Sequence, residues 1–143
     1  MKPTKRNKLT IASLLLSTCF LLVPGAHAQD KAIAAKDVEW GYLNPAHGDK
    51  SPCAADLWGD THLLYGSLVK LPQGFEGEIV AKSDEFKAVV ISGSLKYDNV
   101  KTLDPGSYFT LSKGAHSRIE NEGNKPSIVY IRAESPYHVK DSK

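Results

Sequence analysis

The sequence lacks the short motifs that mark several common enzyme classes. It has no His-x-His or Cys-x-x-Cys pair, and its five histidines are scattered, which argues against a zinc site. It has no Gly-x-Ser-x-Gly nucleophile elbow, and no P-loop or dinucleotide-binding glycine pattern. The chain therefore offers no local motif for metal, acyl-transfer or nucleotide chemistry, and we predict no catalytic residue.

Charge is absent from a long apolar stretch near the start of the chain. Residues 9–23 are uncharged and rich in leucine, they follow four basic residues, and Ala26-His27-Ala28 gives a small-x-small pattern before Gln29. These three parts are typical of a cleavable signal peptide, and the run is shorter than the roughly 20 residues that span a bilayer. We expect residues 1–28 to be a signal peptide, and the mature protein to be periplasmic or secreted without a stable membrane anchor.

Removal of this segment changes the charge and the cysteine content. Four of the 18 basic residues leave with it and none of the 16 acidic residues does, so residues 29–143 have 14 basic groups and a formal net charge of −2. No basic patch then indicates nucleic-acid binding. Cys19 also leaves, so Cys53 has no partner for an internal disulfide, and its small neighbours favour a buried structural role.

No segment after residue 36 shows the 3.6-residue apolar period of a helix. Short β-rich runs recur instead, separated by glycine, proline, asparagine and aspartate. This pattern predicts one all-β domain over residues 37–133, an antiparallel barrel or jelly roll. A flexible leader is expected at 29–36 and a loose polar tail at 134–143. The expected strands span residues 37–43, 54–58, 63–71, 75–82, 86–92, 94–98, 107–111, 117–120 and 127–133.

The run 86–91 shows the two faces of one strand. Alternate residues of a strand point to opposite faces, and here Phe86 and Val90 fall on one face while Val89 and Ile91 fall on the other. Because both faces are largely apolar, we expect this strand to be covered on both sides.

Glycine, proline and asparagine recur at fixed spacings between residues 74 and 121. Gly74 and Gly93 enclose one segment, and Pro105-Gly106 and Asn121 enclose a second. Together with the sequence stretches at 37–42, 57–60 and 86–93, this spacing resembles the pattern of the cupins. The resemblance is to the ChrR-like branch in particular, and to an uncharacterised family within it that is named only as a domain of unknown function. The resemblance implies a small antiparallel β-barrel. In many cupins two His and a Glu of the first segment and a His of the second converge on a divalent metal.

The positions that hold the metal in those cupins are substituted in this chain. They carry Val80, Lys82, Phe86 and Ser117. Valine and phenylalanine have no ligating atom, and a protonated lysine has no lone pair. The substitutions therefore predict a barrel without the usual metal and without another cofactor.

Two alternatives for the inward-facing residues stay open. A shift of one residue in the first segment would turn Ala81, Ser83 and Glu85 inward and Phe86 outward. If the loop over residues 113–115 were one residue tighter, His116 would point inward in place of Ser117.

The resulting hypothesis is an exported binding or regulatory module whose barrel holds a small apolar or anionic ligand. In it Lys82 supplies charge, Phe86 an apolar wall, and His116 and Ser117 hydrogen bonds. Lys82 has a second interpretation, in which it extends from the barrel mouth into water.

Two other functions are compatible with the sequence. One is a metal-dependent isomerase, lyase or dioxygenase-like enzyme with atypical ligands, such as His116 with Glu78 or Glu85. The other is a structural or interaction module that forms a homodimer.

Overall fold

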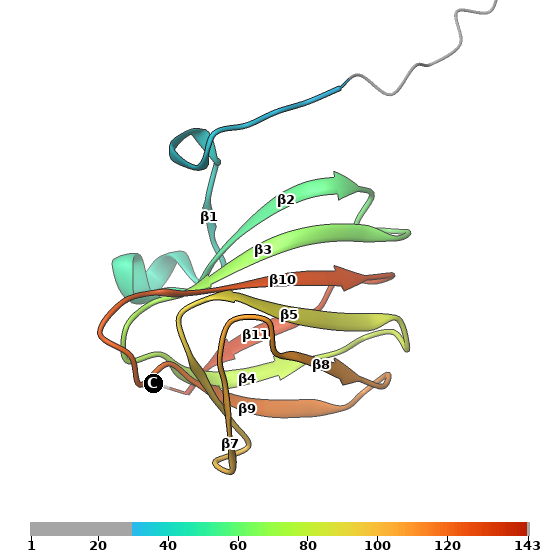
Figure 1. The fold of residues 1–143 in the computed structure, drawn as a ribbon. Helices are drawn as coiled ribbons and strands as arrows, with labels where there is room; N and C mark the ends of the chain where they lie inside the picture. Colours follow the sequence, from blue (N-terminus) through green and yellow to red (C-terminus); the bar gives the residue numbers. More distant parts are fainter. Residues whose placement is uncertain (1–29, 143) are drawn as a thin grey trace, which may run out of the picture. The chain divides into compact units, whose positions relative to one another are not determined.

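Two antiparallel sheets lie face to face in the part of the chain that the structure, a computed structural model, describes, residues 30–142 (Figure 1). Both sheets belong to one unit, Ile33–Lys143, which is separate from Met1–Ala32. The predicted signal peptide lies outside the described residues. No helix among residues 30–142 is long and apolar enough to cross a membrane.

The strands divide into a sheet of six and a sheet of five. The larger sheet has the order β1-β2-β3-β10-β5-β8 and the smaller sheet the order β11-β4-β9-β6-β7. The larger sheet consists of β1 (Gly41–Tyr42), β2 (Cys53–Gly59), β3 (Tyr65–Leu71), β10 (Ser127–Ala133), β5 (Phe86–Ser92) and β8 (Tyr108–Leu111). The smaller sheet consists of β11 (His138–Asp141), β4 (Glu76–Val80), β9 (His116–Glu120), β6 (Leu95–Tyr97) and β7 (Lys101–Leu103). Two short 3-10 helices, η1 (Ala35–Asp37) and η2 (Pro45–Lys50), precede β1 and β2 respectively.

The core lies between the two sheets and follows from the alternation of residues along each strand. In β3 and β10 the pairing places Val69 opposite Val129, and both side chains are fully buried. In the facing sheet Ile79 and Ile119 are fully buried as well. Each aliphatic side chain of this kind contributes about 1.5–3 kcal/mol when it leaves water. The predicted all-β class with a jelly-roll arrangement is confirmed.

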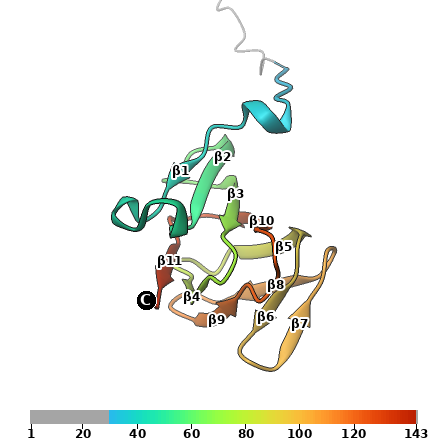
Figure 2. The same ribbon diagram turned by 90° about the vertical axis from the view of Figure 1, so that its left-hand side faces the viewer.

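The main differences from the predicted strands lie near the ends of the domain. Of the strand expected over residues 37–43 only Gly41–Tyr42 pairs with the sheet, and η1 precedes it. The short polar strand β7 (Lys101–Leu103) was not predicted. The prediction of a loose tail is wrong for residues 138–141, because β11 pairs with β4 along its whole length, as Figure 2 shows at the edge of the smaller sheet.

A glycine makes the β4–β11 pairing possible. A Cβ atom on Gly77 would clash with the carbonyl oxygen of Lys140, which lies on β11. Glycine inside a strand often marks such a close approach of two backbones. The apolar pattern of the tail is weak, but its backbone hydrogen-bonding groups suffice to extend the sheet.

The expectation that β5 is covered on both sides is wrong. Phe86 and Val90 are each 1% exposed, but Ile91, on the opposite face, is 51% exposed. Cross-strand pairing places Val89 between Tyr130 and Tyr108 on this outer face. The larger sheet therefore carries an outward row of apolar side chains that continues to Leu68, which pairs with Tyr130.

Asn121 joins two turns at one end of the domain. Its side chain is almost fully buried, and its Nδ2 lies 3.1 Å from the carbonyl oxygen of Leu71, 3.0 Å from that of Pro72 and 2.9 Å from that of Lys125. Its Oδ1 accepts the backbone N–H of Gly123 at 3.0 Å. The amide thus satisfies backbone groups of the β3–β4 turn and of the β9–β10 turn at once.

Replacement of this amide should destabilise the whole domain. Asn121→Ala leaves one buried backbone carbonyl, that of Leu71, and three part-buried backbone groups without this partner. We therefore expect the free energy of unfolding to fall by about 2–4 kcal/mol, since an unsatisfied buried group costs roughly 1–3 kcal/mol. Urea unfolding followed by circular dichroism measures the change. Asn124→Ala, in the same turn but exposed, is the matched control and should change the stability by less than about 0.5 kcal/mol. Equal effects of the two substitutions would contradict this role of Asn121.

Candidate functional site

The first cupin-like segment places different residues inside the barrel from those predicted. Ala81 is fully buried, whereas Val80 is half-buried and Lys82 is exposed. The pairing of Ile79 with Ser117 sets this orientation, because both residues point between the sheets. The prediction that Val80 and Lys82 face inward is therefore wrong, and the alternative with a shift of one residue is correct for Ala81 and Ser83, which are buried.

Phe86 and Ser117 do face inward, as predicted. Phe86 is 1% exposed and Ser117 is 3% exposed. Residues 82–85 form a bend without strand pairing, so the alternation of β4 does not continue into β5. For this reason Glu85 is not carried inward as the shifted alternative required. It lies 3.2 Å from the Lys87 ammonium and 2.8 Å from the Arg132 guanidinium, and these contacts lower the pKa of the Glu85 carboxyl.

His116 lies on the outer face of the smaller sheet. Its side chain is 65% exposed, and its Nδ1 is 3.6 Å from Oε1 of Glu78, which is also outward. The alternative in which His116 points inward is wrong. The four predicted ligand-binding residues are thus divided, with Phe86 and Ser117 inside the barrel and Lys82 and His116 outside.

Aromatic rings pack around Phe86 between the two sheets. The ring of Phe86 packs edge-on against Tyr137, with 5.7 Å between centroids, and lies 6.2 Å from Phe109. Tyr137 also stacks on Tyr65 at 6.2 Å. Sequence reasoning missed Tyr137, which precedes β11 in the segment expected to be loose. The available signal was one aromatic residue in an otherwise polar tail.

The polar groups inside the barrel pair with one another. The Ser117 hydroxyl donates to the Tyr97 hydroxyl at 2.7 Å, and the Ser67 and Tyr137 hydroxyl oxygens lie 2.6 Å apart. Burial raises the pKa of the Tyr137 phenol, and its hydrogen bond to Ser67 offsets part of this effect. Among residues 30–142 the Ser83 hydroxyl is a buried side-chain group without a hydrogen-bond partner.

The interior does not offer ligands for a divalent metal. Apart from serine hydroxyls and tyrosine phenols, the inward side chains around the expected site are apolar. No group of three or more His, Cys, Asp or Glu residues with a geometry suited to a metal occurs in the described part of the chain. The ligands suggested for a metal enzyme are not brought together, because His116 and Glu78 lie on one outer face and Glu85 pairs with basic residues of the other sheet. A cupin metal therefore does not fit this donor set.

Cys53 is half-buried, not fully buried as predicted. Its Sγ lies 3.7 Å from the carbonyl oxygen of Ser51, and burial is the main cause that raises the pKa of the thiol. A raised pKa disfavours the reactive thiolate at neutral pH.

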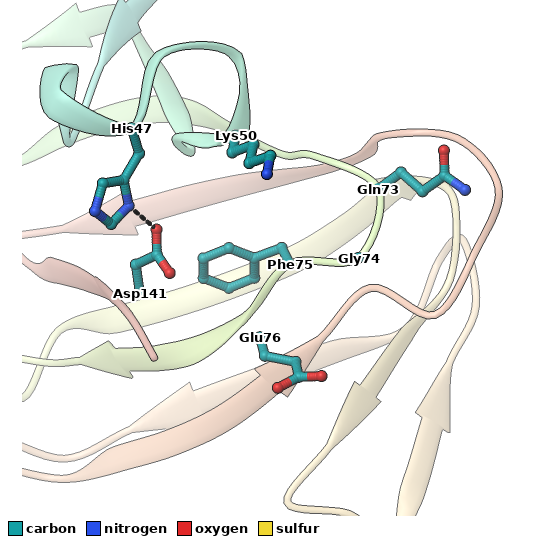
Figure 3. Close-up of a pocket in the computed structure, with 7 residues that line it drawn as sticks. All are labelled: His47, Lys50, Gln73, Gly74, Phe75, Glu76 and Asp141. Carbon is teal, nitrogen blue, oxygen red and sulfur yellow. Dashed lines mark hydrogen bonds and ion pairs between the residues drawn. The ribbon is translucent and has the colours of Figure 1, made fainter. Parts of the chain in front are cut away.

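A pocket of about 450 Å³ lies where η2, the start of β4 and the end of β11 meet (Figure 3). Its walls combine polar and charged side chains with the buried ring of Phe75. The lining residues are His47, Lys50, Gln73, Gly74, Phe75, Glu76 and Asp141.

A contact between His47 and Asp141 closes one side of this pocket. The His47 Nδ1 lies 2.6 Å from Oδ2 of Asp141, although the two residues are 94 positions apart in the sequence (Figure 3). The carboxylate is largely buried, with 13% of its side chain exposed, while the imidazole is 35% exposed. No local pattern links the two residues, since Asp141 lies in the segment expected to be a loose tail and His47 lies 94 positions before it.

Comparison with known proteins places this fold in a family. Residues 61–140, more than half of the chain, match the family described as a domain of unknown function (DUF4437). The chain belongs to this family. A search of curated proteins finds no match.

Solved structures with the same fold as this DUF4437 domain include cupins. An RmlC-like cupin from Ralstonia eutropha JMP134 is similar with 14% identity and a TM-score of 0.61, over 80% of this chain and 74% of that one. The polyketide cyclase RemF from Streptomyces resistomycificus is similar with 12% identity and a TM-score of 0.60, over 80% of this chain and 87% of that one. A chain in the structure of Rhodobacter sphaeroides SigE in complex with the anti-sigma ChrR is similar with 16% identity and a TM-score of 0.56. The match covers 71% of this chain and 51% of that one. The resemblance to cupins is confirmed, and since these proteins differ in function, the likeness shows the fold alone.

The half-buried phenol of Tyr137, whose pKa is raised by burial, should make the stability of the DUF4437 domain sensitive to high pH. Folding raises the pKa of this phenol above its unfolded value of 10.0. The neutral phenol therefore contributes its full share of the stability below pH 10.0, and this share is lost as the pH rises toward the folded pKa. We expect the free energy of unfolding to fall more steeply above pH 10 in the native chain than in Tyr137→Phe, which has no phenol to ionise. Urea unfolding at a series of pH values measures both slopes. Tyr108→Phe, at a tyrosine that is 75% exposed, is the control and should lose stability with pH as steeply as the native chain does. An equally steep loss in Tyr137→Phe would show that the Tyr137 phenol does not cause the pH dependence.

Proposed function

We propose that this protein is exported and binds a small polar molecule, without a metal, in the pocket between η2, β4 and β11. The amino-terminal segment has the three parts of a signal peptide, which supports export. The inward side chains of the barrel offer no set of metal ligands, which supports binding without a metal.

The contrast between the filled barrel and the open pocket carries this proposal. Aromatic rings and paired hydroxyls occupy the space between the sheets. The pocket has a volume of about 450 Å³, within the range of roughly 300–1,000 Å³ that is usual for small-molecule sites. Elements far apart in the sequence meet there, so the site depends on the completed fold.

The side chains of the pocket indicate a ligand with both hydrogen-bond donors and acceptors. Lys50 brings an ammonium group, Glu76 and Asp141 bring carboxylates, and Gln73 brings an amide that donates and accepts (Figure 3). Phe75 adds an apolar wall. A large apolar molecule would leave these charges without water, so sugars and amino acids fit the lining better.

Blocking the pocket tests the site. Gln73→Trp places an indole at an exposed turn position on the pocket wall, and we expect it to abolish the binding of whichever members of a library of sugars, amino acids and organic acids the native chain binds. Ligand-observed NMR, with saturation transfer to each compound, measures binding. Asn124→Trp puts the same side chain on an exposed turn outside the pocket and should bind as the native chain does. Equal binding by Gln73→Trp and the native chain would place the ligand elsewhere.

Export has its own test. Expression of the full chain in a Gram-negative host should give a soluble periplasmic product whose mass corresponds to residues 29–143, because cleavage is expected after Ala28. Mass spectrometry of the periplasmic fraction measures this. Substituting Ala26 and Ala28 with aspartate should leave the uncleaved chain in the membrane fraction. A full-length cytoplasmic product from the native sequence would contradict export.

A further inference from the structure

Tyr137 occupies the barrel in the manner of a bound molecule. Its ring is parallel to that of Tyr65, with an interplanar angle of 2°, and almost perpendicular to that of Phe86, at 81°. Its hydroxyl oxygen is 2.6 Å from that of Ser67. The site around it thus has two aromatic walls and one hydroxyl partner, the elements that recognise a phenol.

The walls of this site belong to the core, but Tyr137 does not. Ser67 is 0% exposed and Phe86 is 1% exposed, and they lie on β3 and β5, each of which pairs with β10. Tyr137 is only half-buried, and it lies between the end of β10 at Ala133 and the start of β11 at His138, where no strand pairing holds the backbone. Removal of its ring from the barrel would need a change in only these few residues, and it would break the hydrogen bond that the Tyr65 hydroxyl donates to the carbonyl oxygen of Ser135 at 3.4 Å.

The polar partner makes the site selective. If Tyr137 left without a replacement, the buried Ser67 hydroxyl would lose its partner, at a cost of roughly 1–3 kcal/mol. A phenol that enters restores this hydrogen bond and both ring contacts. Burial disfavours a charged phenolate, so the ligand that fits is neutral.

We propose that the barrel contains a binding site for a small neutral phenol, which Tyr137 occupies in the free protein and vacates when the ligand binds. This site is separate from the pocket at η2 and does not depend on the function proposed for that pocket. The affinity for an added phenol is reduced by the fraction of molecules in which Tyr137 fills the site. Removing the tyrosine ring should therefore raise the affinity.

The experiment uses p-cresol, which reproduces the Tyr137 side chain, and toluene, which lacks the hydroxyl. Calorimetric titration of the purified protein should give saturable p-cresol binding to the native chain, and binding at least about tenfold tighter to Tyr137→Ala. In Tyr137→Ala toluene should bind at least about tenfold more weakly than p-cresol, because it leaves Ser67 unpaired. Adding Ser67→Ala to Tyr137→Ala should remove this preference. Gln73→Trp should bind p-cresol as the native chain does, which separates this site from the pocket at η2.

The native chain decides the outcome. If Tyr137→Ala binds p-cresol and the native chain shows no saturable binding at millimolar concentrations, Tyr137 is a permanent part of the core and the proposal is overturned. If Tyr137→Ala does not fold, Tyr137→Phe replaces it, since it keeps the ring and loses the hydrogen bond to Ser67. It should bind p-cresol more tightly than the native chain, and unchanged or absent binding would overturn the proposal.

Discussion

The structure depends on filling the space between two facing sheets with side chains that need no water. Aliphatic residues of β3, β10, β4 and β9 fill one part, and aromatic rings around Phe86 fill another. The few hydroxyl groups in this space are mostly paired with each other, as Ser67 is with Tyr137. Phe86 packs against Tyr137 and Phe109 in this space, and the side chains around it offer no group of metal ligands among the described residues.

This filling moves the polar chemistry of the protein to its surface. The outer face of the smaller sheet carries ion pairs such as that between Arg118 and Glu120, at 2.7 Å. The outer face of the larger sheet carries the apolar row that includes Val89 and Tyr108. The pocket at η2 lies apart from both, because it forms only where the η2 loop meets the ends of β4 and β11.

Much of the fold follows from the sequence, because apolar β-branched runs have few alternatives. The strands expected over 86–92 and 127–133 coincide with β5 and β10. β11 was missed because its residues are mostly polar, and the one sign of it was Gly77, where a second backbone approaches closely. Sequence alone could not show that a strand lay on the other side of that glycine.

The candidate sites were harder to predict than the strands. The spacing that resembles cupins placed Phe86 and Ser117 correctly, but it failed for Val80 and Lys82, because the orientation of β4 depends on its pairing with β9. The bend at residues 82–85 then lets β4 and β5 have independent orientations. The pocket at η2 could not be predicted from the sequence, since His47 and Asp141 meet only through tertiary contacts that no local pattern encodes.

The late position of β11 in the chain has a consequence for synthesis. β4 pairs with β9 on one side and β11 on the other, so its second edge stays open until every strand from β5 to β10 has been made. An open strand edge is a template for pairing with other chains. Two glutamates, Glu76 and Glu78, lie on β4, and charge along an unpaired edge opposes such pairing. Glu76 and Glu78 thus oppose pairing of β4 with another chain whenever β11 is not in place.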